Sequence, residues 1–107
     1  MGIFEFTVND SFLDGSGHPI TIPKSQLPYK ALAAIGLNHK QATVILPHGE
    51  RFEAEIYHGE AGYGEYYQLR FNGGNRTLPS YLKLNDHVIV LLAKAAGHSY
   101  AILEYRG

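Results

Sequence analysis

Cysteine is absent from this sequence, which excludes disulfide bonds and thiolate metal sites together. No apolar run approaches the roughly 20 residues that a membrane-spanning helix needs. Residues 1–5 also lack the basic start that is typical of a secretion signal. With 107 residues, the chain is long enough for a single hydrophobic core. We therefore expect one domain over residues 1–107, located in the cytoplasm and without contact to a membrane.

An excess of positive charge is also missing, because the formal net charge is −1 at pH 7. Proteins that hold nucleic acid by bulk electrostatics usually carry a basic excess, so the overall charge argues against that mode of binding. A local positive surface would need the cations to gather on one face of the fold. The residues that would have to gather are Lys24, Arg51, Arg70, Arg76 and Lys83.

Clusters of catalytic or metal-binding residues are not evident either. The six histidines include no His-x-His or His-x3-His pair, and no carboxylate recurs around them at ligand spacing. Neither a Ser-His-Asp order nor a nuclease-like acidic cluster with a nearby lysine can be assembled. We therefore expect a non-catalytic domain without a metal or another cofactor.

The sequence does contain a series of short β-type patterns. Apolar and polar residues alternate over residues 3–8 and 66–71, and further strands are predicted at residues 20–22, 42–46, 51–57, 86–93 and 99–105. Residues 47–50 have a turn composition that predicts a hairpin between two of these strands. Residues 88–92 are apolar on both faces, as expected of a central strand that is covered on both sides.

Helix signals are few. Pro28 is followed by apolar residues at helical spacing until Gly36, which predicts one short helix. Short, closely spaced strands with so little helix favour a mainly β fold, and we expect a seven-stranded open β-barrel with one or two short helices. Residues 9–19 and 58–65 are rich in polar residues and glycine, which predicts two loops that project from the barrel.

Four short motifs follow one another in an informative order. A first strand leads through Ser16-Gly17-His18 into an Ile-x-Ile-Pro strand, and a hairpin surrounds His48-Gly49-Glu50. A glycine-rich segment then enters Leu-Arg-Phe-Asn-Gly-Gly, and Leu-x-Leu-x-Asp precedes the penultimate strand. This order resembles the DNA-binding pseudobarrel superfamily, known from the plant B-three transcription-factor domain and from the recognition or effector domain of EcoRII-type restriction endonucleases. The resemblance covers nearly the whole chain.

The resemblance implies an open seven-stranded barrel that grips the major groove of double-stranded DNA with two arms. The N-arm corresponds to residues 9–19 and the C-arm to residues 57–66. In the restriction-enzyme branch a Gly-His pair closes the N-arm, and this sequence has Gly17-His18 at that place. That branch implies a nuclease domain or subunit as partner, which would carry any cleavage activity.

Base-reading candidates lie on the two arms. They are Asn9, Asp10, Ser11, Ser16, His18, Tyr57, His58, Glu60, Tyr63 and Glu65. Residues 52–69 contain no lysine or arginine, so guanine reading by an arginine of the C-arm is not expected. Carboxylates there would accept from cytosine amino groups, and tyrosines would pack on thymine methyls or bond phosphates. The alternative for the N-arm residues is an ordinary polar turn, with His18 solvated.

Phosphate-binding candidates surround Gly73-Gly74, where backbone N–H groups and two guanidinium groups would form a phosphate cradle. They are Arg70, Asn72, Asn75 and Arg76, with Lys24 as a further cation after the Ile-Pro strand. The alternative is a hairpin turn with solvated basic side chains.

Two other classes of function stay open. Residues 20–24 and 84–88 also resemble the swapped-hairpin AbrB family of dimeric transcription regulators, although those domains are about half as long. A small β-barrel that binds a ligand or another protein is compatible with the near-neutral charge and the eight tyrosines.

Overall fold

The fold consists of seven strands and one short helix. The computed structural model describes residues 2–15, 17–27, 30, 41–62, 64–71 and 81–106. In chain order the elements are β1 (Gly2–Thr7), α1 (Asp10–Asp14), β2 (Ile20–Ile22), β3 (Gln41–Ile45), β4 (Arg51–Ala61), β5 (Gly64–Phe71), β6 (His87–Ala95) and β7 (His98–Tyr105). Within the described residues no helix is long and apolar enough to cross a membrane.

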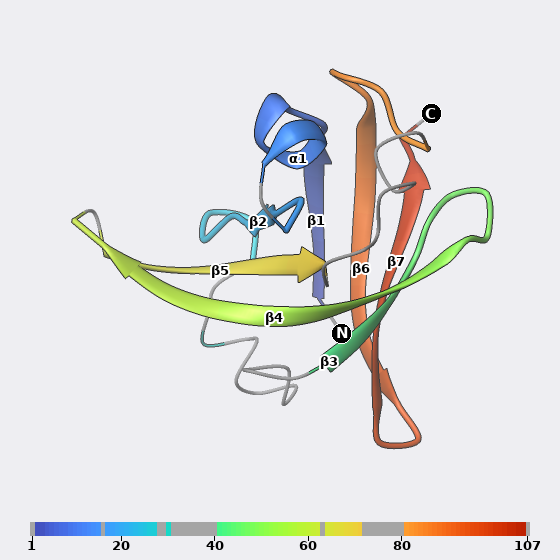
Figure 1. The fold of residues 1–107 in the computed structure, drawn as a ribbon. Helices are drawn as coiled ribbons and strands as arrows, with labels where there is room; N and C mark the ends of the chain where they lie inside the picture. Colours follow the sequence, from blue (N-terminus) through green and yellow to red (C-terminus); the bar gives the residue numbers. More distant parts are fainter. Residues whose placement is uncertain are drawn as a thin grey trace.

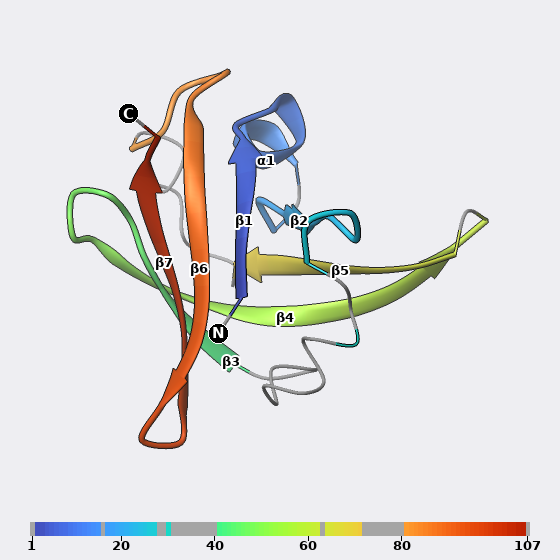
Figure 2. The same cartoon turned by 180° about the vertical axis from the view of Figure 1, so that it is seen from behind.

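All seven strands belong to one sheet in the order β1-β6-β7-β3-β4-β5-β2. β3 and β7 are parallel, and the other neighbouring pairs are antiparallel. Figures 1 and 2 show β1, β6 and β7 running steeply across β4 and β5, so the sheet curls into a barrel. The strands at the two ends of the order, β1 and β2, face each other across an unsealed seam. The predicted open seven-stranded barrel is therefore confirmed.

The seam between β1 and β2 is partly covered by a side chain. The Glu5 N–H on the edge of β1 donates to Oε1 of Gln26 at 2.7 Å. Gln26 lies in the turn that follows β2, where the Leu27 N–H donates to the Pro23 carbonyl. An open strand edge presents unpaired backbone groups, and this amide satisfies one of them.

Alternating side chains fill the barrel. Along β1, Phe4 and Phe6 are buried while Ile3 and Glu5 point outward. Buried and less buried residues also alternate in β2, β6 and β7, because successive side chains of a strand point to opposite faces of the sheet. The core thus receives a side chain from each strand, including Ile20, Val44, Ile56, Leu69, Val90 and Leu103.

β6 departs in one respect from its prediction. It lies between β1 and β7, as expected of a central strand. Val88, Val90 and Leu92 are buried, but Ile89 and Leu91 are only half-buried on the outer face. The expected cover on both faces is therefore wrong, because no second layer within the described residues packs on the outside of this strand.

The predicted N-arm loop contains the helix α1. Asn9 caps its N-terminus, since the Asn9 Oδ1 accepts from the Phe12 N–H at 2.9 Å. Phe12 anchors the helix, because its ring is fully buried against Phe6 and Phe71. The expectation of a plain polar loop was wrong here because one buried aromatic residue and a good cap are enough to order a single helical turn.

The predicted C-arm loop is a hairpin. β4 continues to Ala61 and β5 begins at Gly64, with Glu60 paired to Glu65 and Gly59 paired to Tyr66. The strands therefore extend well beyond the predicted boundaries at residues 57 and 66. The glycines in this segment suggested a loop, but cross-strand pairing overrides that local preference. The predicted helix after Pro28 lies outside the described residues, apart from Lys30.

Candidate nucleic-acid interface

The two predicted arms leave the barrel on the same side. Figures 1 and 2 show α1 and the tip of the β4–β5 hairpin on the side away from β7. The end of the N-arm lies directly on β5, because the Phe71 N–H donates to the Gly17 carbonyl at 2.8 Å. A β-carbon placed on Gly17 would lie 3.7 Å from the Arg70 β-carbon. The outer face of β5 therefore connects the two arms.

This outer face carries an ordered polar group that we call the Arg70 network, formed by Thr21, Tyr57, Gln68 and Arg70. The Arg70 guanidinium carbon lies 3.7 Å from the centre of the Tyr57 ring. Its Nε donates to the Gln68 Oε1 at 3.0 Å. The Gln68 amide in turn donates from Nε2 to the Thr21 hydroxyl at 3.0 Å. The network thus spans β2, β5 and β4.

The Arg70 network holds one guanidinium group in a defined orientation. A ring face below and an amide beside the guanidinium restrict its motion, and only Nε is used by the amide. The two terminal NH₂ groups have no hydrogen-bond partner among the described residues, and the side chain is half-buried. A guanidinium presented in this way can donate two parallel bonds to a phosphate or to a base edge.

Sequence reasoning identified Arg70 and Tyr57 but missed Thr21 and Gln68. The alternation over residues 66–71 does place Gln68 and Arg70 on one face. The partnership with Thr21 depends on the antiparallel register that sets Thr21 opposite Gln68. That register joins residues 47 positions apart, and no local pattern reports it.

The tyrosines of the C-arm lie against a glycine. Tyr66 extends across Gly59, and the Tyr57 and Tyr66 ring centres are 6.1 Å apart. Gly59 is buried although it carries no side chain, because the Tyr66 ring covers it. On the outer face of the hairpin, the Tyr57 and Tyr66 rings thus form an aromatic surface that extends from the Arg70 network toward the arm tip.

The inner face of the C-arm holds a histidine and a carboxylate. The His58 ring stacks on Tyr67 with 4.5 Å between centroids and 12° between planes. Its Nε2 lies 3.0 Å from the Glu65 Oε2. Glu60 is exposed next to this pair, opposite Glu65. His58 and Glu65 therefore orient each other, whereas the Glu60 carboxylate faces solvent.

The N-arm candidates divide into structural and exposed side chains. The Phe12 carbonyl accepts from the His18 Nδ1–H at 2.7 Å, and the His18 backbone has a φ of 44°. This bond orients the imidazole, so that Nε2 is the ring atom left for an outside partner. Asn9 serves as the helix cap described above. Asp10 and Ser11 are exposed on the first turn of α1.

A second candidate cation, Lys24, follows β2. Its Nζ would lie 3.5 Å from a β-carbon placed on Gly64, so it reaches the base of the C-arm tip. A carboxylate is also present, since Glu55 pairs with Arg70 across β4 and β5 and is exposed. Five candidates lie outside the described residues, and these are Ser16, Tyr63, Asn72, Asn75 and Arg76.

Comparison with known proteins supports the fold. No protein-family model matches this chain, and no curated protein sequence matches it. Among solved structures, a similar fold is found in the Arabidopsis FUS3–DNA complex, with a TM-score of 0.61 at 14% sequence identity over 100% of both chains. The open-barrel fold that the resemblance implies is therefore confirmed.

Proposed function

We propose that this chain binds double-stranded DNA in a sequence-specific manner, with the N-arm (residues 9–19) and the C-arm (residues 57–66) in the major groove. The observation that carries the proposal is the Arg70 network, which presents an oriented guanidinium on the face between the two arms. The similar fold in the FUS3–DNA complex supports it, because that protein is bound to DNA.

The chemistry of the side chains indicates which residues would contact phosphates and which would contact bases. Arg70 and Lys24 bond phosphates and fix the position of the duplex. The major groove, about 12 Å wide, admits a helix or a two-stranded ribbon, and the arms offer one of each. Asp10 and Glu60, both exposed, accept from cytosine or adenine amino groups at the base edges. The His18 Nε2 offers a further acceptor.

The charge of the arms sets the expected salt dependence. Each neutralised phosphate contributes about −0.9 to the slope of log K against log salt concentration. Lys24 and Arg70 alone would give a slope of about −2 on duplex DNA. Because the arms also carry carboxylates, random sequences are expected to bind weakly, and a matching site gains its affinity mainly from base contacts.

A finer proposal concerns the biological context. The Gly17-His18 pair at the end of the N-arm supports a recognition or effector module of a prokaryotic restriction endonuclease, with a nuclease domain or subunit as the partner that performs cleavage. The AbrB-like alternative expects a swapped-hairpin dimer, whereas here one chain supplies all seven strands of the sheet. The interaction-module alternative predicts no affinity for any duplex.

The test is selection of bound duplexes from a randomised pool, followed by anisotropy titration of the enriched and the scrambled sequence at several salt concentrations. An enriched motif with a slope of about −2 on the scrambled duplex supports the proposal. A pool that stays random, together with no binding to any duplex at low salt, overturns it and favours the interaction module.

A further inference from the structure

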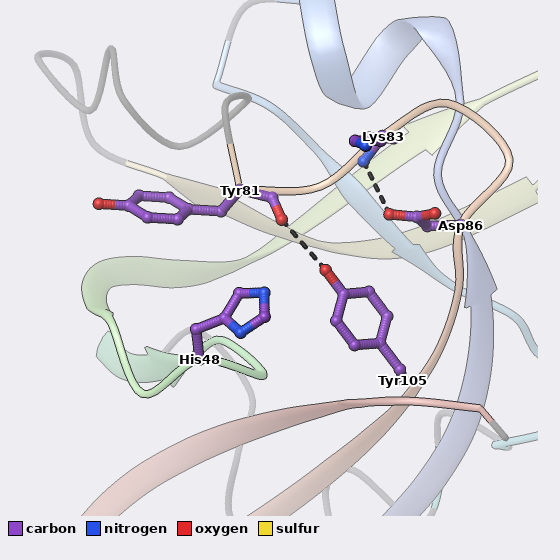
Figure 3. A pocket seen from close by; sticks show the side chains of 5 residues that line it. All are labelled: His48, Tyr81, Lys83, Asp86 and Tyr105. Carbon is purple, nitrogen blue, oxygen red and sulfur yellow. Dashed lines mark hydrogen bonds between the residues drawn. The ribbon is translucent and has the colours of Figure 1, made fainter.

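The protein has a cavity of about 420 Å³, and its lining residues are His48, Tyr81, Lys83, Asp86 and Tyr105. It is formed by the β3–β4 turn, the segment before β6 and the end of β7. Figure 3 shows the His48 and Tyr105 rings and the Asp86 carboxylate around it. Its volume is in the range that holds a small ligand or an inserted side chain.

The aromatic wall of the cavity is held in place by contacts within the chain. The His48 and Tyr105 rings meet edge to face, with 5.7 Å between centroids and 63° between planes. The Tyr105 hydroxyl donates to the Tyr81 carbonyl at 3.2 Å. Because that proton is already used, the phenol oxygen faces an incoming group as an acceptor.

Negative charge gathers beside this wall. Asp86 accepts from the Lys83 N–H through Oδ2 at 2.8 Å, which leaves its Oδ1 without a partner among the described residues. Glu50, in the same turn as His48, has a buried Oε2 that no described residue bonds. Burial first, then the charges of Asp86 and Glu50, raise the pKa of Tyr105 above its ordinary 10.0. Both carboxylates therefore act on the cavity wall.

We propose that this cavity binds an arginine side chain of a partner protein. A guanidinium group can lie flat on an aromatic ring while it donates to carboxylates, and Arg70 on Tyr57 shows that arrangement within this chain. The Asp86 Oδ1 supplies an acceptor at the cavity lining, and the Glu50 carboxylate adds negative charge near Tyr105. The Lys83 ammonium is exposed, so solvent screens its repulsion.

The surroundings of the cavity indicate a protein rather than a nucleic acid as the source of the arginine. Leu84 is 50% exposed and Tyr105 is 41% exposed, and they are two of the three large apolar side chains that the described residues expose. Tyr105 lines the cavity, and Leu84 lies in the sequence between the lining residues Lys83 and Asp86, so exposed apolar side chains accompany the Asp86 carboxylate. A carboxylate would repel phosphates and suits a basic protein segment.

The test uses the full chain labelled with ¹⁵N and the peptide acetyl-Gly-Arg-Gly-amide as the probe. Amide signals of residues 48–50 and 83–86 should shift in a saturable manner. The same peptide with citrulline, which is neutral and similar in shape, should leave them unchanged. Equal shifts with citrulline, or shifts confined to the arm residues 59–61, would overturn the proposal.

Substitutions of single carboxylates test which side chain binds the arginine peptide. Asp86→Asn should weaken the arginine peptide about tenfold, because a charge-assisted hydrogen bond is lost. Glu104→Gln is the matched control, since Glu104 is an exposed carboxylate on β7 outside the lining of the cavity. This variant should bind the arginine peptide with unchanged affinity. Asp86→Asn should keep the native spectrum, because its amide oxygen can still accept from the Lys83 N–H. If that spectrum is lost, Glu50→Gln replaces it with a smaller expected loss of affinity, because it removes negative charge near Tyr105. Unchanged affinity in the folded variant contradicts the proposal.

Discussion

The guanidinium carbon of Arg70 lies 3.7 Å from the centre of the Tyr57 ring, so a cation of β5 rests on an aromatic side chain of β4. The arrangement joins the two arms, because Gly17 at the end of the N-arm lies against the same arginine.

Removing the Arg70 side chain should weaken binding to every duplex. Arg70→Ala removes a proposed phosphate contact, so the salt slope should fall by about 1 for specific and scrambled DNA alike. Arg70→Lys keeps the charge but cannot stack as a planar group, so its DNA affinity should lie between those of wild type and Arg70→Ala. Anisotropy titrations measure both. Arg51→Ala is the control, because Arg51 is exposed at the opposite end of β4, and an equal loss there would contradict a specific role of Arg70.

Tyr57 should act through Arg70. Tyr57→Leu keeps apolar bulk but removes the ring face, which contributes about 0.5–1 kcal/mol at exposed sites. We expect DNA affinity to fall in Tyr57→Leu and to fall no further when Arg70→Ala is added. A double-mutant cycle of the two changes measures this coupling. Additive losses would show that the two side chains contact DNA independently.

Gly59→Ala should displace Tyr66 without unfolding the barrel. An added β-carbon would collide with the outer end of the Tyr66 ring and with Cε1 of the Tyr57 ring. Both are ends of side chains that can swing away, so the cost should stay near the lower end of overpacking, about 1 kcal/mol. Thermal melting and the Tyr66 ring signals in NMR spectra measure the change. Gly62→Ala, in the same hairpin, is the matched control, since nothing lies within 4 Å of its added carbon. Identical spectra for Gly59→Ala and wild type would show that Tyr66 does not cover Gly59.

His18→Ala should loosen the N-arm. The variant loses the bond from Nδ1 to the Phe12 carbonyl at 2.7 Å and the contact of the ring with Phe12. A single hydrogen bond of this kind contributes about 0.5–1.5 kcal/mol to the free energy of unfolding. Chemical denaturation measures it. His87→Ala serves as the control, because His87 bonds Thr7 at the exposed surface and its loss should change stability little. Equal losses in both variants would rule out a specific anchoring role of His18.

Ionisation of Tyr105 should slightly lower the stability of the fold at alkaline pH. Burial, then Asp86 and Glu50, raise its pKa in the folded state, so folding favours the protonated phenol. The associated stability is present below the unfolded pKa, near 10, and is lost as the pH rises through the folded pKa. Melting temperatures above pH 10 should therefore fall more steeply in wild type than in Tyr105→Phe. Because Tyr105 is 41% exposed, the difference should be small, and parallel curves would show that it is negligible.

Features that depend on local alternation could be predicted from the sequence, whereas features that depend on contacts between strands could not. The alternation of Phe4 and Phe6 with exposed neighbours appears in the sequence, because a strand repeats every two residues. The sequence does not show how far the C-arm strands extend, since His58 and Tyr67 pair only once β4 and β5 lie side by side. The helix α1 was also missed, because the burial of Phe12 depends on Phe6 and Phe71, which come from other strands.

The sequence by itself determined the mainly β architecture, the positions of the strands and the two segments that leave the barrel, because these follow from local alternation and turn composition. The tertiary structure alone decided that Thr21 faces Gln68 and that Arg70 rests on Tyr57. It also brought His48, Asp86 and Tyr105 around one cavity. Those contacts depend on which strands become neighbours and in which register, and strand order is a property of the whole packed sheet.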